Sequence, residues 1–142
     1  MHSALLLGTG LLLASLLSFA VAIALVVSLM SRVIRTGYFG ESFWKNVAIM
    51  IIISLVMAVA HLMEIVLWAA VFWVSSEIST FEEAFYFSAQ NYTTLGYGDI
   101  VLSDRWRLLG PLEAINGLLL FGLSTAVMFA ALSRLVSGRL RS

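Results

Sequence analysis

Long apolar stretches separated by short polar segments dominate the pattern of this sequence. They run over residues 4–30, 47–74 and 108–136. The hydrocarbon core of a bilayer needs about 20 helical residues, and each stretch exceeds that length. The pattern therefore predicts an all-α membrane protein with three transmembrane helices. Because no long linker or internal repeat interrupts it, we expect a single domain over residues 1–142.

A shorter segment, residues 81–92, lies between the second and third apolar stretches. As a helix it would cover only about 18 Å, which is too short to cross a bilayer. Just before it, Ser79 and Thr80 each stand three residues ahead of a glutamate, so either pair fits a capping box at a helix start. We expect a short re-entrant helix that enters the membrane and turns back.

Composition agrees with a membrane protein. Hydrophobic residues make up 61% of the chain and charged residues 11%, and the mean hydropathy is +1.02. The formal net charge is +0 without a long basic run, so membrane lipids are expected partners and nucleic acid is not. Cysteine is absent, which excludes disulfides and thiolate metal sites. With two histidines and no His-Glu-x-x-His arrangement, an intramembrane metallohydrolase is not favoured.

Basic residues indicate how the chain crosses the membrane, because short loops rich in Lys and Arg stay in the cytoplasm. They cluster between the first two apolar stretches and at the end of the third: Arg32, Arg35, Lys45, Arg134, Arg139 and Arg141. With three crossings, this pattern predicts a multi-pass cell-membrane protein with its N-terminus outside and its C-terminus in the cytoplasm. A secretory signal over residues 4–30 is not favoured, because no basic residue precedes that stretch.

The most informative motif is the TTLGYGD run, residues 93–99, which directly follows the short segment. Removing water from a cation in a low-dielectric medium costs tens of kcal/mol, so a path for ions must offer replacement oxygen atoms. Backbone carbonyls of successive residues point to one side only if alternate residues take left-handed angles, which glycine tolerates. Gly96 and Gly98 have that spacing, so the run predicts a cation path lined by main-chain oxygens.

Residues 81–99 resemble the pore of the potassium channel family, in which a short helix leads into a selectivity filter that binds ions through backbone carbonyls. The resemblance continues into the third apolar stretch at residues 117–126. It implies that K⁺ occupies the filter and that no organic cofactor or enzymatic activity is needed. The implied K⁺ ligands are the carbonyls of Thr94, Leu95, Gly96 and Tyr97 and the Thr94 hydroxyl. Gly98 would complete the turn, and Gln90, Thr93 and Asp99 would support the filter.

The same resemblance implies a gating hinge in the last helix, where a glycine allows the helix to bend. Gly117 is the first candidate and Gly122 the second. For Gly117 an equally good interpretation is close packing, because small residues let membrane helices approach one another. The sequence leaves both interpretations open.

Three ionisable groups lie well inside the apolar stretches, away from the basic residues at their ends. His61 and Glu64 are three residues apart and share a helix face, and Glu113 lies at a similar depth on the third stretch. Intramembrane ionisable groups are functional candidates by default, and histidines or paired carboxyls titrate near neutrality. A pH-sensitive element is therefore one interpretation, and structural hydrogen bonding is the alternative.

Together these observations predict a potassium-selective channel that conducts passively as a homotetramer, because one chain supplies one pore loop and a filter needs four. Residues 81–99 would form the pore helix and filter, residues 108–136 the inner helix, residues 47–74 the outer helix and residues 4–30 a peripheral helix. Leu95 replaces the valine that is frequent in the family, which makes a weakly selective cation channel one alternative. A non-conducting regulatory subunit built on the pore fold is the other.

Overall fold

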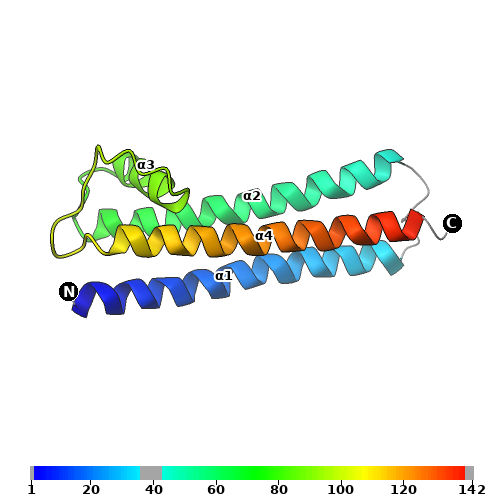
Figure 1. Ribbon diagram of the computed structural model, residues 1–142, viewed down its shortest axis with the longest axis horizontal. Helices are drawn as coiled ribbons and strands as arrows, with labels where there is room; N and C mark the ends of the chain where they lie inside the picture. Colours follow the sequence, from blue (N-terminus) through cyan, green and yellow to red (C-terminus); the bar gives the residue numbers. More distant parts are fainter. Residues whose placement is uncertain (1, 36–42, 140–142) are drawn as a thin grey trace.

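The computed structural model describes residues 2–35 and 43–139 and contains four helices in those ranges (Figure 1). They are α1 (His2–Arg35), α2 (Phe43–Val74), α3 (Phe81–Tyr92) and α4 (Leu109–Arg139). Within these, Ser3–Val33, Phe43–Val74 and Leu109–Ser137 are long and apolar enough to cross a membrane. The all-helical fold with three candidate membrane spans is thereby confirmed. Of the basic residues used for the orientation, Arg141 lies outside the described residues.

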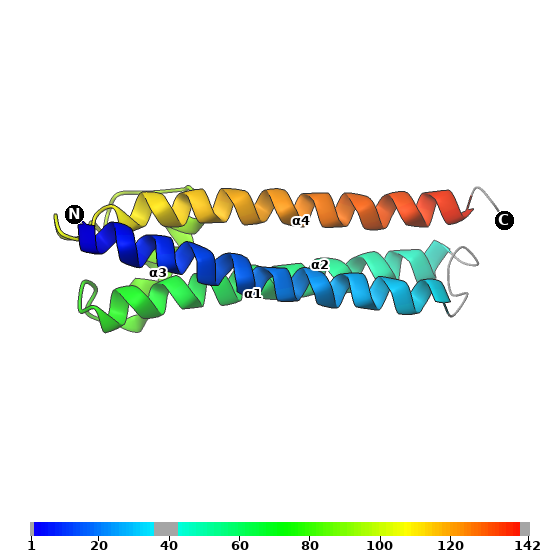
Figure 2. The same ribbon diagram turned by 90° about the horizontal axis from the view of Figure 1, so that it is seen from below.

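The three long helices lie side by side along the molecule, and α3 packs at one end against α2 and α4 (Figures 1 and 2). α1 and α4 start at that same end, whereas α2 runs in the opposite direction. The N-terminal end of α1 and the segment that joins α3 to α4 therefore lie at one end, and the C-terminal end of α4 lies at the other (Figure 1).

α2 begins earlier than the apolar stretch in the sequence. It starts at Phe43 rather than at residue 47. Phe43, Trp44 and Lys45 are compatible with a helix, and their aromatic and basic side chains suit the interface between lipid and water better than the hydrocarbon core. Hydrophobicity alone therefore underestimates the length of this helix.

Apolar side chains cover much of the outer surface. On α1, Leu6, Leu13, Leu17, Val21 and Leu25 are all more than half exposed. A soluble monomer rarely presents a continuous apolar surface of this extent, whereas lipid chains stabilise it. The inside of the bundle shows the reverse pattern, because several polar side chains are buried there: Ser15, Glu64, Ser88, Gln90, Glu113, Asn116 and Ser124.

α1 is joined to the rest of the bundle through polar as well as apolar contacts. A hydrogen bond of 2.5 Å joins Ser18 Oγ to Glu64 Oε1 on α2. One turn away, the Trp68 indole donates to Ser15 Oγ at 3.3 Å. The first helix therefore supplies hydrogen-bonding partners to buried groups of α2.

α3 starts with the second of the two predicted capping pairs. The Thr80 hydroxyl accepts a hydrogen bond from the Glu83 backbone N–H at 3.2 Å and donates to the Glu83 carboxylate at 3.0 Å. This satisfies one of the free amides at the helix start. The helix then runs for 12 residues to Tyr92, so the TTLGYGD run begins directly at its end.

Candidate functional site

The backbone of the TTLGYGD run alternates between ordinary and left-handed conformations. The φ angles of Thr94, Gly96 and Gly98 are +61°, +54° and +77°. Left-handed angles were expected at the two glycines, but Thr94 extends the alternation by one residue. A β-branched residue with positive φ is strained, and such strain persists mainly at functional sites. Threonine itself does not favour this angle. Thr94 nevertheless lies two residues before Gly96, so the alternation that the two glycines set predicts a left-handed angle there.

The start of the run is held against the last turn of α3 by backbone hydrogen bonds. The Gln90 carbonyl accepts from the N–H of Leu95 at 2.8 Å and from that of Gly96 at 3.3 Å. In contrast, none of the hydrogen bonds between described residues ends on a carbonyl of residues 94–98. Oxygen atoms along the run therefore stay free for another partner.

The Gln90 side chain braces the run from behind. It is only 6% exposed, its amide N–H donates to Asp99 Oδ1 at 3.2 Å, and its amide oxygen accepts from the Tyr97 backbone N–H at 2.9 Å. One neutral amide thus contacts both the middle and the end of the run. Its bond to Tyr97 was not predictable from the sequence, because the pattern does not reveal how the run folds back.

Asp99 stays charged at the end of the run. Burial raises its pKa, but hydrogen bonds from the Gln90 amide, the Tyr86 hydroxyl and backbone amides outweigh burial and lower the pKa below its usual value. The same hydrogen bond to Asp99 raises the pKa of Tyr86. Tyr86 of α3 thus supplies a hydroxyl donor to the end of the run.

Other residues of the run have fewer internal contacts. The Thr93 hydroxyl bonds the Ala89 carbonyl at 2.7 Å, which keeps it on its own helix. The side chains of Leu95 and Tyr97 are 55% and 67% exposed. Both apolar side chains therefore lie at the surface of the single chain, beside the braced backbone.

A second hydrogen-bonded contact joins the segment that follows the run to the loop that precedes α3. The Glu77 carboxylate, just after α2, accepts from the Ser103 N–H and from the Ser103 hydroxyl, both at 2.9 Å. This bidentate contact links the two loops that flank α3 and the run. No sequence pattern indicates this contact, because the two residues are far apart in the chain and neither belongs to a recognisable motif.

The three intramembrane ionisable groups do not bond one another. His61 bonds Tyr92 and Ser124, Glu64 bonds Ser18, and Glu113 bonds Ser88. Each group therefore bonds a hydroxyl group on at least one helix other than its own. Structural hydrogen bonding, one of the two interpretations from the sequence, is present at all three positions.

The two candidate hinge glycines have different surroundings. A Cβ atom added to Gly117 would lie 1.9 Å from the Tyr92 carbonyl oxygen, so α4 touches the end of α3 there. A Cβ atom added to Gly122 would meet nothing within 4 Å. Close packing is therefore observed at Gly117, while bending at either glycine stays a prediction.

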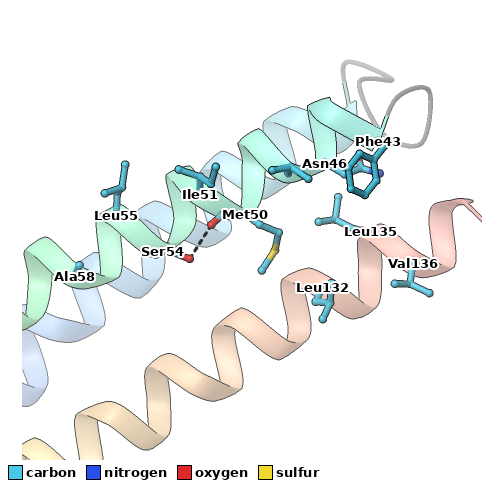
Figure 3. Close-up of a pocket in the computed structure, with 11 residues that line it drawn as sticks. Phe43, Asn46, Met50, Ile51, Ser54, Leu55, Ala58, Leu132, Leu135 and Val136 are labelled. Atoms are coloured by element: carbon cyan, nitrogen blue, oxygen red, sulfur yellow. Dashed lines mark hydrogen bonds between the residues drawn. The ribbon is translucent and has the colours of Figure 1, made fainter.

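A groove of about 610 Å³ lies far from the run, between the start of α2 and the end of α4 (Figure 3). Its lining is mostly apolar, and the Ser54 hydroxyl donates a hydrogen bond to the Met50 carbonyl at 2.9 Å. No ionisable side chain is among its described lining residues. The groove thus offers no chemistry comparable to that of the run.

Replacing Gln90 by alanine is expected to loosen the run, because the change removes both the bond to Asp99 and the bond to the Tyr97 N–H. Two hydrogen bonds of ordinary strength correspond to about 1–3 kcal/mol of stability. Thermal unfolding of the purified protein in K⁺-containing detergent solution measures the loss. Asn91→Ala is the matched control, since the Asn91 amide donates to the Phe87 carbonyl of its own helix. Equal stability of the two variants would contradict the bracing role.

Comparison with known families gives one match. A family model described as an ion channel matches residues 60–134, which is more than half of the chain. The matched part runs from within α2 through α3 and the run to the last turns of α4. Comparisons with curated proteins and with solved structures gave no match.

Proposed function

This chain belongs to the ion channel family, with a pore of the potassium-channel type, and we propose that it conducts K⁺ selectively and passively through the TTLGYGD run. The observation that carries the proposal is the alternation of left-handed angles at Thr94, Gly96 and Gly98. This alternation turns successive carbonyls to the same side, where they can replace the water around a dehydrated cation. The proposed K⁺ ligands are the carbonyls of Thr94, Leu95, Gly96 and Tyr97, with the Thr94 hydroxyl at one end.

The free carbonyls and the braced backbone support this function together. A rigid ring of oxygens is useful only if its spacing is maintained, and Gln90 fixes the run at Tyr97 and Asp99. Passive conduction involves no catalytic step, so the proposal includes neither enzymatic activity nor an organic cofactor.

A homotetramer is part of the proposal, because a single run surrounds an ion on one side only. The exposed side chains of Leu95 and Tyr97 support assembly beside the path. On α4, Leu118, Leu119 and Phe129 are also at least half exposed and are available to line a central cavity or to contact a second copy. Lipids would cover the remaining apolar surface.

The proposed orientation places the N-terminus and the run on the outer side of the cell membrane. Both lie at one end of the molecule (Figure 1). Arg32 and Arg35 lie in the last turn of α1, at the opposite end, and basic residues favour the cytoplasm. α3 would then enter the membrane from outside with its C-terminal end pointing inwards, where its dipole favours a cation.

Reconstitution of the purified chain in liposomes tests the proposed function. K⁺ efflux down a concentration gradient, blocked by Ba²⁺, is the expected result, and the reversal potential in mixed K⁺ and Na⁺ should lie close to the K⁺ equilibrium potential. A reversal potential midway between the two ions would favour a weakly selective cation channel. Absence of flux at every pH and voltage, in a preparation that is shown to be folded and tetrameric, would favour a non-conducting subunit.

A further inference from the structure

One imidazole joins three of the four helices. His61 on α2 makes hydrogen bonds of 2.7 Å through Nδ1 to the Tyr92 hydroxyl on α3 and through Nε2 to Ser124 Oγ on α4. Its ring also stacks on Phe121 of α4 with centroids 4.3 Å apart, and Phe19 of α1 covers it at 5.0 Å.

The number of available protons determines which ring nitrogen donates. The Ser124 hydroxyl has one proton, and it donates to the Leu120 carbonyl at 2.9 Å. Ser124 Oγ must therefore accept from His61, so Nε2 carries the imidazole proton. In the neutral ring Nδ1 is then an acceptor, and the Tyr92 hydroxyl donates to it. Every donor in this chain of bonds has an acceptor only while the imidazole is neutral.

Tyr92 keeps the proton that this arrangement requires. Burial raises the pKa of Tyr92. The hydroxyl is therefore protonated at any pH near neutrality. The side chain is fully buried, so it has no water to use as an alternative acceptor.

Tyr92 is placed where a small movement matters for the run. It is the last residue of α3, and the TTLGYGD run starts at the next residue. Its carbonyl oxygen faces α4 at Gly117, where no space is left for a Cβ atom. The hydroxyl at His61 and the carbonyl at Gly117 together fix the end of α3 between α2 and α4.

The other ionisable groups around His61 have separate partners. On α2, Glu64 bonds Ser18 of α1, and on α4, Glu113 bonds Ser88 of α3. The Ser88 hydroxyl also lies 2.9 Å from the Ile65 carbonyl. If its single proton goes to that carbonyl, Glu113 must donate to Ser88 and is a neutral acid. From α1 the ring meets Phe19, which has no ionisable group.

We propose that His61 is a positioning residue for conduction: as a neutral imidazole it fixes the end of α3 to α4, and its protonation in acid releases Tyr92 and lowers K⁺ flux. A second proton on Nδ1 turns it into a donor that faces the Tyr92 hydroxyl, so two donors oppose each other. The Tyr92 proton then loses its acceptor, and the end of α3, from which the run starts, loses one of its two attachments. This inference rests on the proposed function and assigns a pH response to the same pore.

The test compares K⁺ flux from liposomes between about pH 8 and about pH 5, the range in which histidine charge changes. In the unaltered protein we expect flux to fall at least about fivefold in acid, the effect of one ordinary hydrogen bond. His61→Gln should keep the neutral-pH flux and remove the acid response, because an amide offers one acceptor and one donor at a similar spacing and does not titrate. Tyr92→Phe should give a low flux that does not depend on pH.

His2, the other histidine in the sequence, provides the matched control. His2→Gln should keep the acid response unchanged. A response that persists in His61→Gln, or a flux of the unaltered protein that is equal at both ends of the pH range, would overturn the inference while leaving the proposed function intact.

A spectroscopic measurement separates the two proposals further. In His2→Gln protein labelled with ¹⁵N-histidine, the remaining imidazole belongs to His61, and its ¹⁵N chemical shifts report the tautomer. We expect the Nε2-protonated form at neutral pH and the doubly protonated form in acid. The Nδ1-protonated form would contradict the inference. If K⁺ flux were absent at every pH, the proposed function would fail and the acid effect with it, whereas the tautomer would still test the placement of the ring.

Discussion

Replacing Gly117 by alanine is expected to prevent the chain from forming a stable protein. The new Cβ atom would lie 1.9 Å from the Tyr92 carbonyl oxygen and 2.9 Å from its carbonyl carbon, far inside contact distance. Both neighbours are backbone atoms, so no side chain can rotate away, and α3 and α4 must separate instead. Overpacking of a tight interior typically costs about 1–3 kcal/mol and occasionally more, and we expect a loss at or above about 3 kcal/mol here.

Gly122→Ala is the matched control for this prediction. It is the same substitution five residues further along the same helix, where the added Cβ atom meets nothing within 4 Å. Thermal unfolding and size-exclusion chromatography in detergent should show a folded, uniform Gly122→Ala protein and an unfolded or aggregated Gly117→Ala protein. Two variants of equal stability would show that α3 does not pack against Gly117 as described.

The second large effect is expected at Gly98, which has a φ of +77°. An L-residue in the left-handed region is strained by about 1–2 kcal/mol, and a tetramer would repeat that strain in every subunit. Alanine at this position should shift the run towards ordinary angles and turn carbonyls away from the ion path. We expect K⁺ flux to fall at least about a hundredfold while the protein remains folded.

Gly10→Ala controls for the loss of a glycine as such. Gly10 lies within α1 with nothing within 4 Å of an added Cβ atom, and alanine is the better helix former. This variant should conduct like the unaltered protein. The K⁺ flux of both variants is measured in liposomes, after both proteins have been shown to assemble. Only Gly98→Ala should show the loss of flux. Selective K⁺ flux through the Gly98→Ala protein would contradict the proposal that conduction depends on the alternation of left-handed angles.

Much of the fold follows from local patterns. Three apolar stretches give the long helices, and α3 covers the same residues, 81–92, that the short segment predicts. A capping box at the start of α3, for which Thr80 was one of two candidates, and the positive φ angles of Gly96 and Gly98 also follow, because capping and left-handed angles depend on a few neighbouring residues. Entry of α3 into the membrane and assembly around an axis stay predictions.

What the sequence could not predict depends on how the helices are rotated and shifted against one another. His61, Glu64 and Glu113 are visible as costly groups inside apolar stretches, but their serine and tyrosine partners lie on other helices. Helical periodicity tells which residues share a face and not which face meets which neighbour. For the same reason, the sequence could not show that Gly117 packs against the Tyr92 backbone, and bending at this glycine stays a prediction.

The bond between Ser18 and Glu64 bears on how small a working version of this chain can be. Shortening the protein to the two long helices around the run would leave the Glu64 carboxyl pointing at hydrocarbon with no hydroxyl to face. Such an exposed acid is expensive in lipid, so we expect a version without α1 to be less stable than the full chain. The N-terminal helix would then contribute to the stability of the bundle that carries the run.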